Sequence, residues 1–204
     1  MKIWTKDDVK DIELPEGVGL NDVQVIGPLF SKEEMEEIIA WKDKYKGKEG
    51  TVGYSGLENT DIRKVMCYRP KEHIKWVAQR ILDHVQKVNN LIWDFDIMGI
   101  EAEPALMEYK EYKDGEVAGH YDWHVDTGRG NFSSRKLSFS VILNTDYTGG
   151  DLTFFVGDKS EKIDKERAYR SLVLFPSYRP HKITPVRTGT RYTLVGWING
   201  PAFR

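Results

Sequence analysis

The spacing of apolar residues changes along the chain, from a helical period in the first part to a period of two in the second. From residue 93 onward, apolar and polar residues alternate in short segments that are separated by Gly, Asn and Asp. Alternation is typical of strands with one buried face, and many short strands predict an antiparallel sandwich or jelly roll. The predicted strands span residues 93–97, 105–112, 119–126, 137–143, 151–156, 170–175 and 191–197.

Two helices are predicted before this β-rich part. Ser31 and Glu34 have the spacing of a capping box, and the apolar stripe that follows should end near residues 45–47. A second helix is predicted over residues 71–89, where apolar residues recur every three or four positions. Two short strands are predicted over residues 23–26 and 62–68.

The organisation of the chain is predicted to be simple. No internal repeat and no linker composition interrupts its 204 residues, so we expect a single domain of the α+β class over residues 1–204. Residues 1–92 are expected to be a mostly helical support, and residues 93–204 the jelly-roll core.

The amino-acid composition limits the cell compartments and the kinds of partner that we expect for this chain. The chain is 40% hydrophobic and 30% charged, with a net charge of −2, so there is no basic excess that would favour nucleic acid as a partner. A single cysteine excludes an internal disulfide and any cysteine-based metal cluster. No apolar run approaches the roughly 20 residues of a membrane span, and the N-terminus lacks the apolar region of a signal peptide. We therefore expect a cytoplasmic protein with no membrane partner.

The most informative stretch is residues 119–126, in which two histidines and two aspartates alternate. In a strand, His120, Asp122, His124 and Asp126 would share one face, and a divalent metal is the obvious partner for them. His181 is the only later histidine, and two histidines with one carboxylate form the facial triad of non-haem Fe(II) oxygenases. The simpler alternative is a pair of surface histidines beside a loop.

A buried cation is predicted near the C-terminus. Arg191 lies ten positions after His181 and opens an apolar strand, where it would share a face with Thr193 and Val195. An arginine inside a β-core needs an anion, and its planar group fits a carboxylate. A salt bridge to one of the acidic residues of the chain is the alternative.

Several motifs, taken together in order, resemble one enzyme family. They are Tyr121-x-x-His124-x-Asp126, Leu143-Asn144, Tyr147-x-Gly149-Gly150-Asp151-Leu152, Phe175-Pro176, His181, Pro185-Val186-x-x-Gly189-x-Arg191-x-Thr193 and Trp197-Ile198-x-Gly200-Pro201. This set is similar to the Fe(II)/2-oxoglutarate-dependent dioxygenases of the prolyl 4-hydroxylase type. The resemblance covers about residues 93–204 and implies a double-stranded β-helix (jelly-roll) core with N-terminal supporting helices.

The resemblance also implies roles for individual residues. His124, Asp126 and His181 would bind Fe(II), and Arg191 would bind the distal carboxylate of 2-oxoglutarate. The implied helpers of the cosubstrate site are Thr193, Tyr112 and the pocket aromatic Trp197. The chain departs from the family in having three extra residues between Gly115 and Tyr121, so Tyr109 is a rival to Tyr112. The pair His120-x-Asp122 has the same spacing as His124-x-Asp126, and Tyr121 favours the second pair.

The implied activity is hydroxylation of a C–H bond by Fe(II), 2-oxoglutarate and O2, with release of succinate and CO2 and with ascorbate as a reductant. A prolyl residue in a peptide or protein is the substrate that the resemblance favours, and residues 47–61 and 127–131 could close over it. Free amino acids and small metabolites stay open as substrates. Two further alternatives are a cupin-like metal enzyme with other chemistry and a non-catalytic β-sandwich that binds a partner. The sequence does not indicate an oligomeric state.

Overall fold

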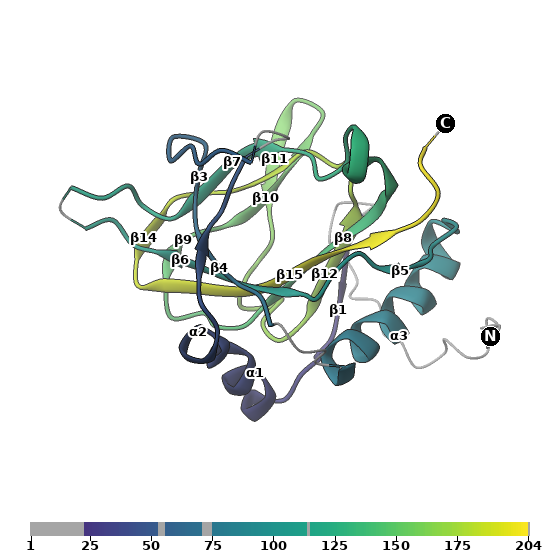
Figure 1. Cartoon of the computed structure of the whole chain (residues 1–204), viewed down its shortest axis with the longest axis horizontal. Coiled ribbons are helices and arrows are strands. Elements are labelled where there is room, and N and C mark those ends of the chain that lie inside the picture. The colour runs from purple at the N-terminus through teal and green to yellow at the C-terminus, as the bar shows by residue number, and fades with distance from the viewer. Residues whose placement is uncertain (1–22, 53–55, 71–74, 114, 204) are drawn as a thin grey trace.

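Two antiparallel sheets lie face to face in the computed structural model, which describes residues 23–52, 56–70, 75–113 and 115–203 (Figure 1). The larger sheet has the strand order β1 (Gln24–Ile26), β12 (Leu172–Pro176), β8 (Arg135–Ile142), β15 (Thr190–Asn199), β6 (Ala105–Lys110), β4 (Met66–Tyr68) and β2 (Lys48–Glu49), and β5 (Gly99–Ile100) pairs with β15. The smaller sheet has the order β11 (Lys159–Lys162), β10 (Leu152–Val156), β13 (His181–Ile183), β7 (His120–His124) and β3 (Arg63–Lys64). A separate pair is formed by β14 (Val186–Thr188) and β9 (Thr148–Gly149). The predicted jelly-roll core is confirmed.

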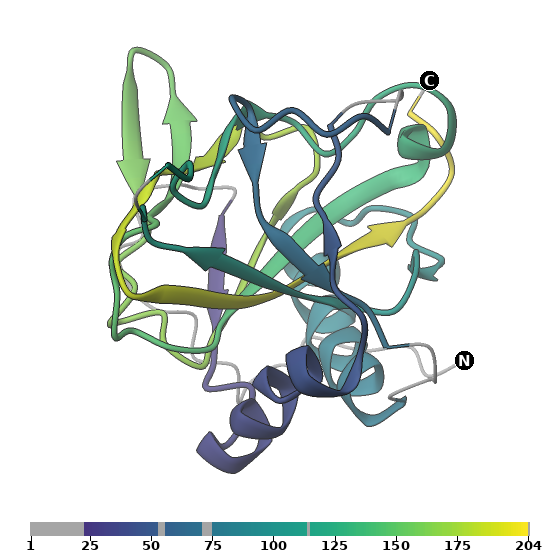
Figure 2. The ribbon, with the colours of Figure 1, turned by 60° about the vertical axis from the view of Figure 1, so that its left-hand side comes forward.

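Three helices cover the outer face of the larger sheet (Figures 1 and 2). They are α1 (Lys32–Ile39), α2 (Trp41–Lys44) and α3 (Lys75–Ile92). The predicted capping box is present, because the Glu34 amide donates to Ser31 Oγ at 3.2 Å and the Ser31 amide donates to Glu34 Oε2 at 2.8 Å. The first predicted helix is interrupted at Ala40, so α2 is a separate short turn. No helix in the described ranges is long and apolar enough to cross a membrane.

Successive side chains of the larger sheet point to opposite faces, so the apolar residues form one cluster on each face. On β15, Leu194 and Ile198 pack toward the helices, together with Ile81 and Val85 of α3. The alternate residues of the same strand, such as Val195, face the space between the two sheets. The polar residues of the predicted site therefore point into the inner space because they occupy the alternate positions.

The N-terminal part contributes strands as well as helices, and the short strands predicted over residues 23–26 and 62–68 are present as β1, β3 and β4. β1 pairs with β12, β4 pairs with β6, and β3 pairs with β7. These short strands extend both sheets at their edges. Residues 63–68 therefore lie beside the strands that carry the predicted site.

The strand predicted over residues 93–97 is wrong. Asn89, at the end of α3, holds this segment as a loop: its side-chain amide donates to the Phe95 carbonyl at 2.8 Å and accepts from the Phe95 amide at 3.1 Å. Asp94 adopts a left-handed conformation with φ of 51°. The hydrogen bonds to the buried Asn89 side chain take the place of hydrogen bonds to a neighbouring strand. In the sequence, this loop is indicated only by Asn89, a single polar residue on the apolar face of a helix.

The packing of α3 on the sheet gives a stability prediction. Ile81 is completely buried in the helix-side cluster, so Ile81→Ala should lower the free energy of unfolding by about 2–5 kcal/mol in denaturant melts. Ile92 of the same helix is 37% exposed, and Ile92→Ala should cost about 1 kcal/mol or less. Equal losses for the two variants would contradict this packing.

Candidate functional site

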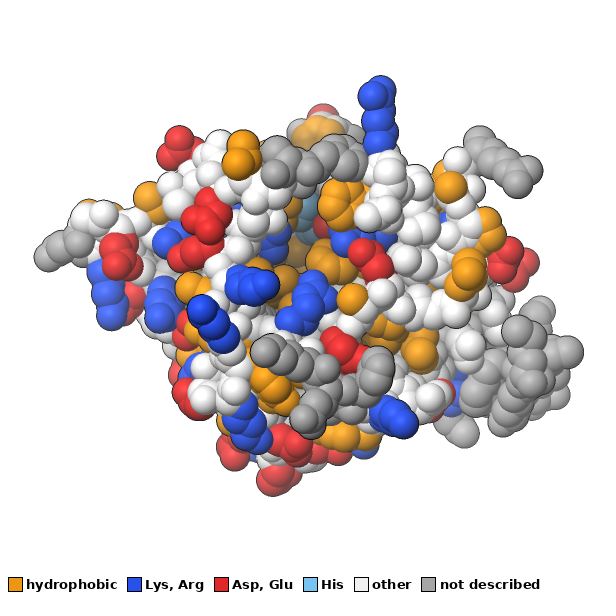
Figure 3. Space-filling model, viewed as in Figure 1, with side chains coloured by type: hydrophobic (Ala, Val, Ile, Leu, Met, Phe, Trp, Pro, Cys, Tyr) orange, Lys and Arg blue, Asp and Glu red, His pale blue; other side chains and the backbone are white. Residues whose placement is uncertain are grey.

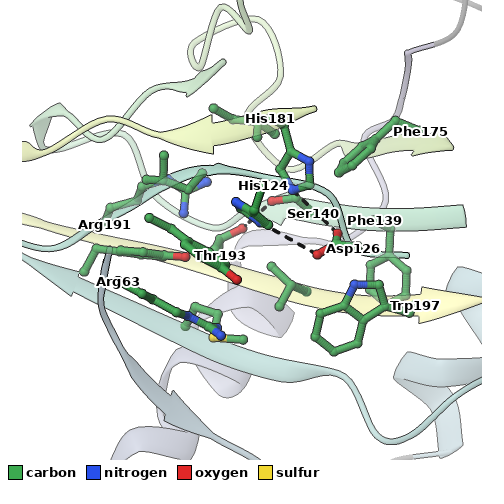
Figure 4. Close-up of a pocket in the computed structure, with 16 residues that line it drawn as sticks. Arg63, His124, Asp126, Phe139, Ser140, Phe175, His181, Arg191, Thr193 and Trp197 are labelled. Carbon is green, nitrogen blue, oxygen red and sulfur yellow. Dashed lines mark hydrogen bonds and ion pairs between the residues drawn. The ribbon is translucent and has the colours of Figure 1, made fainter. Parts of the chain in front are cut away.

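Three predicted side chains meet at the end of β7 and the start of β13. His124 ends β7 and pairs with His181 across the smaller sheet, and Asp126 follows two residues later. One ligand atom from each residue lies within 4.8 Å of the others. The Asp126 carboxylate is 3.7 Å from His124 Nε2 and 3.5 Å from His181 Nε2 (Figure 4). Two imidazoles and one carboxylate converging on one point are a donor set that suits a divalent transition metal.

A β-bulge decides which histidine reaches this point. Between the pairs His181–His124 and Ile183–Tyr121, β7 contains one more residue than β13. The extra residue brings Tyr121 and His124 to the same side, where their rings stack at 3.5 Å. The expectation that His120, Asp122, His124 and Asp126 share one face is therefore wrong.

His120 and Asp122 lie away from the cluster. The ring nitrogens of His120 contact the carbonyl oxygens of Ala118 and Asp61, at 2.9 and 3.1 Å. Asp122 is exposed. Of the two His-x-Asp pairs in the sequence, the structure brings only His124-x-Asp126 to His181.

Backbone carbonyls orient both histidines of the cluster. His124 Nδ1 is 2.7 Å from the Asp122 oxygen, and His181 Nδ1 is 2.9 Å from the Arg179 oxygen. A carbonyl oxygen can only accept, so we assign the proton of each ring to Nδ1. This tautomer leaves the Nε2 lone pairs directed at the centre of the cluster, which is the form that a metal requires.

Burial and neighbouring groups keep the three side chains in the protonation states that bind a cation. Burial lowers the pKa of His124 to about 3, with a further contribution from His181 that Asp126 opposes. Burial alone would raise the pKa of Asp126, but the two histidines and hydrogen bonds from Ser138 and Trp197 hold it below its usual value. A neutral imidazole and an ionised carboxylate are both metal-binding forms.

Two serines support the aspartate from behind. Ser138 Oγ donates to Asp126 Oδ2 at 2.7 Å, and Ser177 Oγ lies 2.9 Å from Ser138 Oγ. The Ser177 carbonyl accepts from the backbone amide of Asp126 at 2.9 Å. Sequence reasoning missed both serines, although Ser138 is a polar residue at an inward position of a strand that is buried throughout.

Arg191 faces the same pocket from its other side (Figure 4). The residue is 1% exposed, and its Nη1 atom has no hydrogen-bond partner. Among the described residues, no carboxylate lies within 4.0 Å of its guanidinium, so the salt-bridge alternative is not observed. An unpaired buried charge costs several kcal/mol, and an anion bound in the pocket would remove this cost.

The remaining predicted residues divide into those that line the pocket and one that does not. Trp197, Thr193 and Tyr109 line it, and the Arg191 guanidinium lies 5.2 Å from the centre of the Tyr109 ring. Tyr112 is 61% exposed and is not among the lining residues, so its predicted place is taken by the rival Tyr109.

Thr193 lines the pocket with a hydroxyl that is already engaged. It donates to the Val141 carbonyl at 2.8 Å and accepts from Ser140 Oγ at 2.7 Å. Its proton is therefore not directed at the pocket. This arrangement fixes the β15 backbone beside Arg191 and does not supply a donor for an anion.

A wider outer pocket of about 370 Å³ adjoins the inner one. Five residues line both, which are Arg63, Met107, Tyr121, Asp126 and Trp197. Figure 3 shows this face hollowed, with basic side chains around the hollow and a histidine at its bottom. The cluster of His124, Asp126 and His181 thus has a buried arginine on one side and the outer pocket on the other.

Sequence reasoning did not single out Arg63. Its guanidinium lies 4.4 Å above the Tyr121 ring, which in turn stacks on His124. The residue belongs to β3, a two-residue strand from the N-terminal part. Only the pairing of β3 with β7 brings it to the site.

Comparisons with known proteins match the part of the chain that carries the candidate site. Residues 107–199 match the family model of the 2OG-Fe(II) oxygenase superfamily. A PKHD-type hydroxylase from Synechococcus sp. (strain CC9902) is 38% identical over 85 residues, which are 41% of this chain and 37% of the relative. A PKHD-type hydroxylase from Acaryochloris marina is 25% identical over 173 residues, which are 81% of this chain and 71% of the relative. The matches span between 36% and 39% of the length of the first three curated relatives.

Solved structures extend the likeness to almost the whole chain. A prolyl hydroxylase from Trichoplax adhaerens, in complex with a hypoxia inducible factor peptide fragment, superposes with a TM-score of 0.72 at 18% identity, covering 90% of this chain and 86% of that one. A Pseudomonas putida prolyl-4-hydroxylase gives a TM-score of 0.67 at 17% identity, covering 96% and 97%. Residues 107–199 are therefore similar to the 2OG-Fe(II) oxygenase superfamily, and the chain has the fold seen in solved prolyl hydroxylases.

Proposed function

We propose that this protein is an Fe(II)/2-oxoglutarate-dependent dioxygenase that hydroxylates a C–H bond, with a prolyl residue of a peptide or protein as the favoured substrate. One observation carries the proposal: a cluster of two histidines and one aspartate shares a pocket with a buried arginine that has no carboxylate partner among the described residues. A metal-binding module with other chemistry has no need of that arginine. The prolyl substrate is supported by the relatives, which are named as PKHD-type and prolyl hydroxylases.

Each residue has a definite task in this proposal. His124, Asp126 and His181 would hold Fe(II), with both imidazoles pre-oriented by backbone carbonyls. Arg191 would bind the far carboxylate of 2-oxoglutarate, and the Tyr109 ring beside it would limit the motion of the cosubstrate. Bound Fe(II) and 2-oxoglutarate supply the activation of O2 that yields succinate, CO2 and a hydroxylated substrate. The protein orients these partners and excludes water.

The first test is an anaerobic titration with Fe(II) and then with 2-oxoglutarate, followed by visible absorption. We expect a metal-to-ligand charge-transfer band that saturates at about one equivalent of each, because the pocket offers one metal cluster and one buried cation. Iron binding without a band would favour the cupin-like alternative. Absence of iron binding would favour a non-catalytic module.

The β-bulge in β7 allows a matched test of the metal ligands. His124→Ala should lower Fe(II) affinity by about a hundredfold or more, because it removes one of three ligands. His120→Ala, four residues earlier in the same strand, should leave Fe(II) affinity unchanged because His120 contacts only backbone oxygens. Equilibrium competition with a metal chelator measures both variants. The reverse result would show that the metal lies at the other His-x-Asp pair.

Arg191 gives a separate prediction about the cosubstrate. Arg191→Met should weaken 2-oxoglutarate binding about a hundredfold, since a charge-assisted pair in a buried site is lost. Iron binding should persist, and the ligand-free variant should melt close to the wild type because the arginine is unpaired there. Thermal melts with and without 2-oxoglutarate in the presence of Mn(II) separate these effects. Stabilisation by 2-oxoglutarate that survives in the variant would contradict the assignment.

A further inference from the structure

We propose that the substrate of this enzyme carries an anionic group, and that Arg63 and Arg69 bind this group in the outer pocket while the reacting C–H bond faces the metal. The inference rests on the proposed function, because it assigns the outer pocket to the substrate. It goes further by naming a chemical feature of the substrate. The relevant observations are the charges that line the outer pocket and the partners that each of them has.

Three arginines and two acidic residues line the outer pocket, and most of these charges are already compensated. Arg135 is paired with Glu101, with Nη2 donating to Oε1 at 2.9 Å. Glu49 is paired with Lys64 at 3.0 Å. Asp126 belongs to the cluster with His124 and His181, where a bound Fe(II) would compensate its charge. The charges of Arg63 and Arg69 are the ones that remain.

Arg63 has neutral partners only. Nη1 donates to the Thr51 carbonyl at 2.8 Å, the guanidinium lies over the Tyr121 ring, and Nε has no hydrogen-bond partner. Gly50 packs tightly against it, since a Cβ at that position would come within 2.6 Å of Arg63 Nε. The arginine is therefore held at the boundary between the inner and outer pockets.

Arg69 is more exposed than Arg63, but its contacts are also with neutral groups. Nη1 donates to the Glu103 carbonyl at 2.6 Å, and the guanidinium lies 6.0 Å from the centre of the Trp197 ring. In the described part of the chain, neither Arg63 nor Arg69 has a carboxylate within 4.0 Å. Two uncompensated guanidinium groups that line the same pocket attract an anion, and their planar donors suit a carboxylate or a phosphate.

The buried Arg191 leaves these two arginines available for the substrate. Arg191 belongs to the inner pocket, where it would hold the cosubstrate, and it does not line the outer pocket. Arg69 lines the outer pocket and not the inner one. Arg69 is therefore the residue whose substitution should affect the substrate and leave the cosubstrate in place.

The test compares pairs of probes that differ only in charge. The Fe(II)- and 2-oxoglutarate-loaded enzyme is given peptides in which a proline is flanked by Glu or by Gln, and by phosphoserine or by serine, and separately proline or prolinamide. Succinate release is measured with ascorbate present. In at least one pair, we expect the anionic probe to exceed its neutral partner about tenfold or more in kcat/KM. The pair that responds identifies whether the anion is an acidic side chain, a phosphate or the carboxylate of a free amino acid.

Variants connect this preference to the outer pocket. Arg69→Gln should reduce the tenfold preference to within about twofold, and Arg69→Lys should restore part of it because the charge is kept. Arg80→Gln is the matched control, since Arg80 pairs with Glu34 between α3 and α1 and lines neither pocket. The charge-transfer band should be the same in all of these variants.

Three results would overturn the inference. They are equal or better use of the neutral probe in every pair, a preference that survives in Arg69→Gln, and no response to any probe. If the wild type still shows the charge-transfer band in these cases, only the anionic substrate is rejected. If the band is absent as well, the proposed function fails with it.

Discussion

The interior between the two sheets holds a buried arginine and a largely buried aspartate that do not pair with each other. Burying either charge without a partner is costly, and a direct ion pair would be the simplest way to reduce the cost. The fold prevents this pairing by placing Arg191 on β15 and Asp126 beyond the end of β7, with the pocket between them. The protein thus keeps both charges available for ligands of opposite sign.

The surroundings of Asp126 show how such a charge is tolerated before a ligand binds. Its carboxylate receives hydrogen bonds from Ser138 and Trp197 and is flanked by two imidazoles. Arg191 hydrogen-bonds with the neutral Tyr147 side chain, but its Nη1 has no hydrogen-bond partner. The half of the pocket that we propose binds the metal is thus organised by the protein itself, whereas the proposed anion would complete the half with Arg191.

The sequence was sufficient for the parts of this structure that depend on periodicity. Alternation in residues 190–199 places Arg191, Thr193, Val195 and Trp197 on one face, and the structure has all four lining the pocket. The capping box of α1 was also predicted, because it is a local pattern of two residues. Features that depend on an irregularity or on distant pairing were not predicted. After Tyr121, the bulge in β7 reverses which side chains point into the pocket. The alternation of residues 119–126 gives no indication of this bulge.

Distant pairing explains the other misses. The strand β13 was not predicted because its three residues are too few for a periodic signal, although His181 at its start was predicted from the motifs. Arg63 reaches the site through the pairing of β3 with β7, two segments almost sixty residues apart. The residues closest to the metal cluster come from regular, recognisable motifs, whereas Arg63 comes from a short edge strand.

The inner and outer pockets share a few side chains, and two of these are the aromatic residues Tyr121 and Trp197. Tyr121 stacks on His124 on one side and lies under the Arg63 guanidinium on the other. An anion that draws Arg63 toward the outer pocket would therefore change the contacts of an aromatic ring that packs directly on His124, one of the proposed metal ligands. Trp197 also contacts both pockets. Its indole hydrogen-bonds with Asp126, and the guanidinium groups of Arg135 and Arg69 lie over its ring. Two aromatic side chains therefore contact both the arginines of the outer pocket and the residues of the His124–Asp126–His181 cluster.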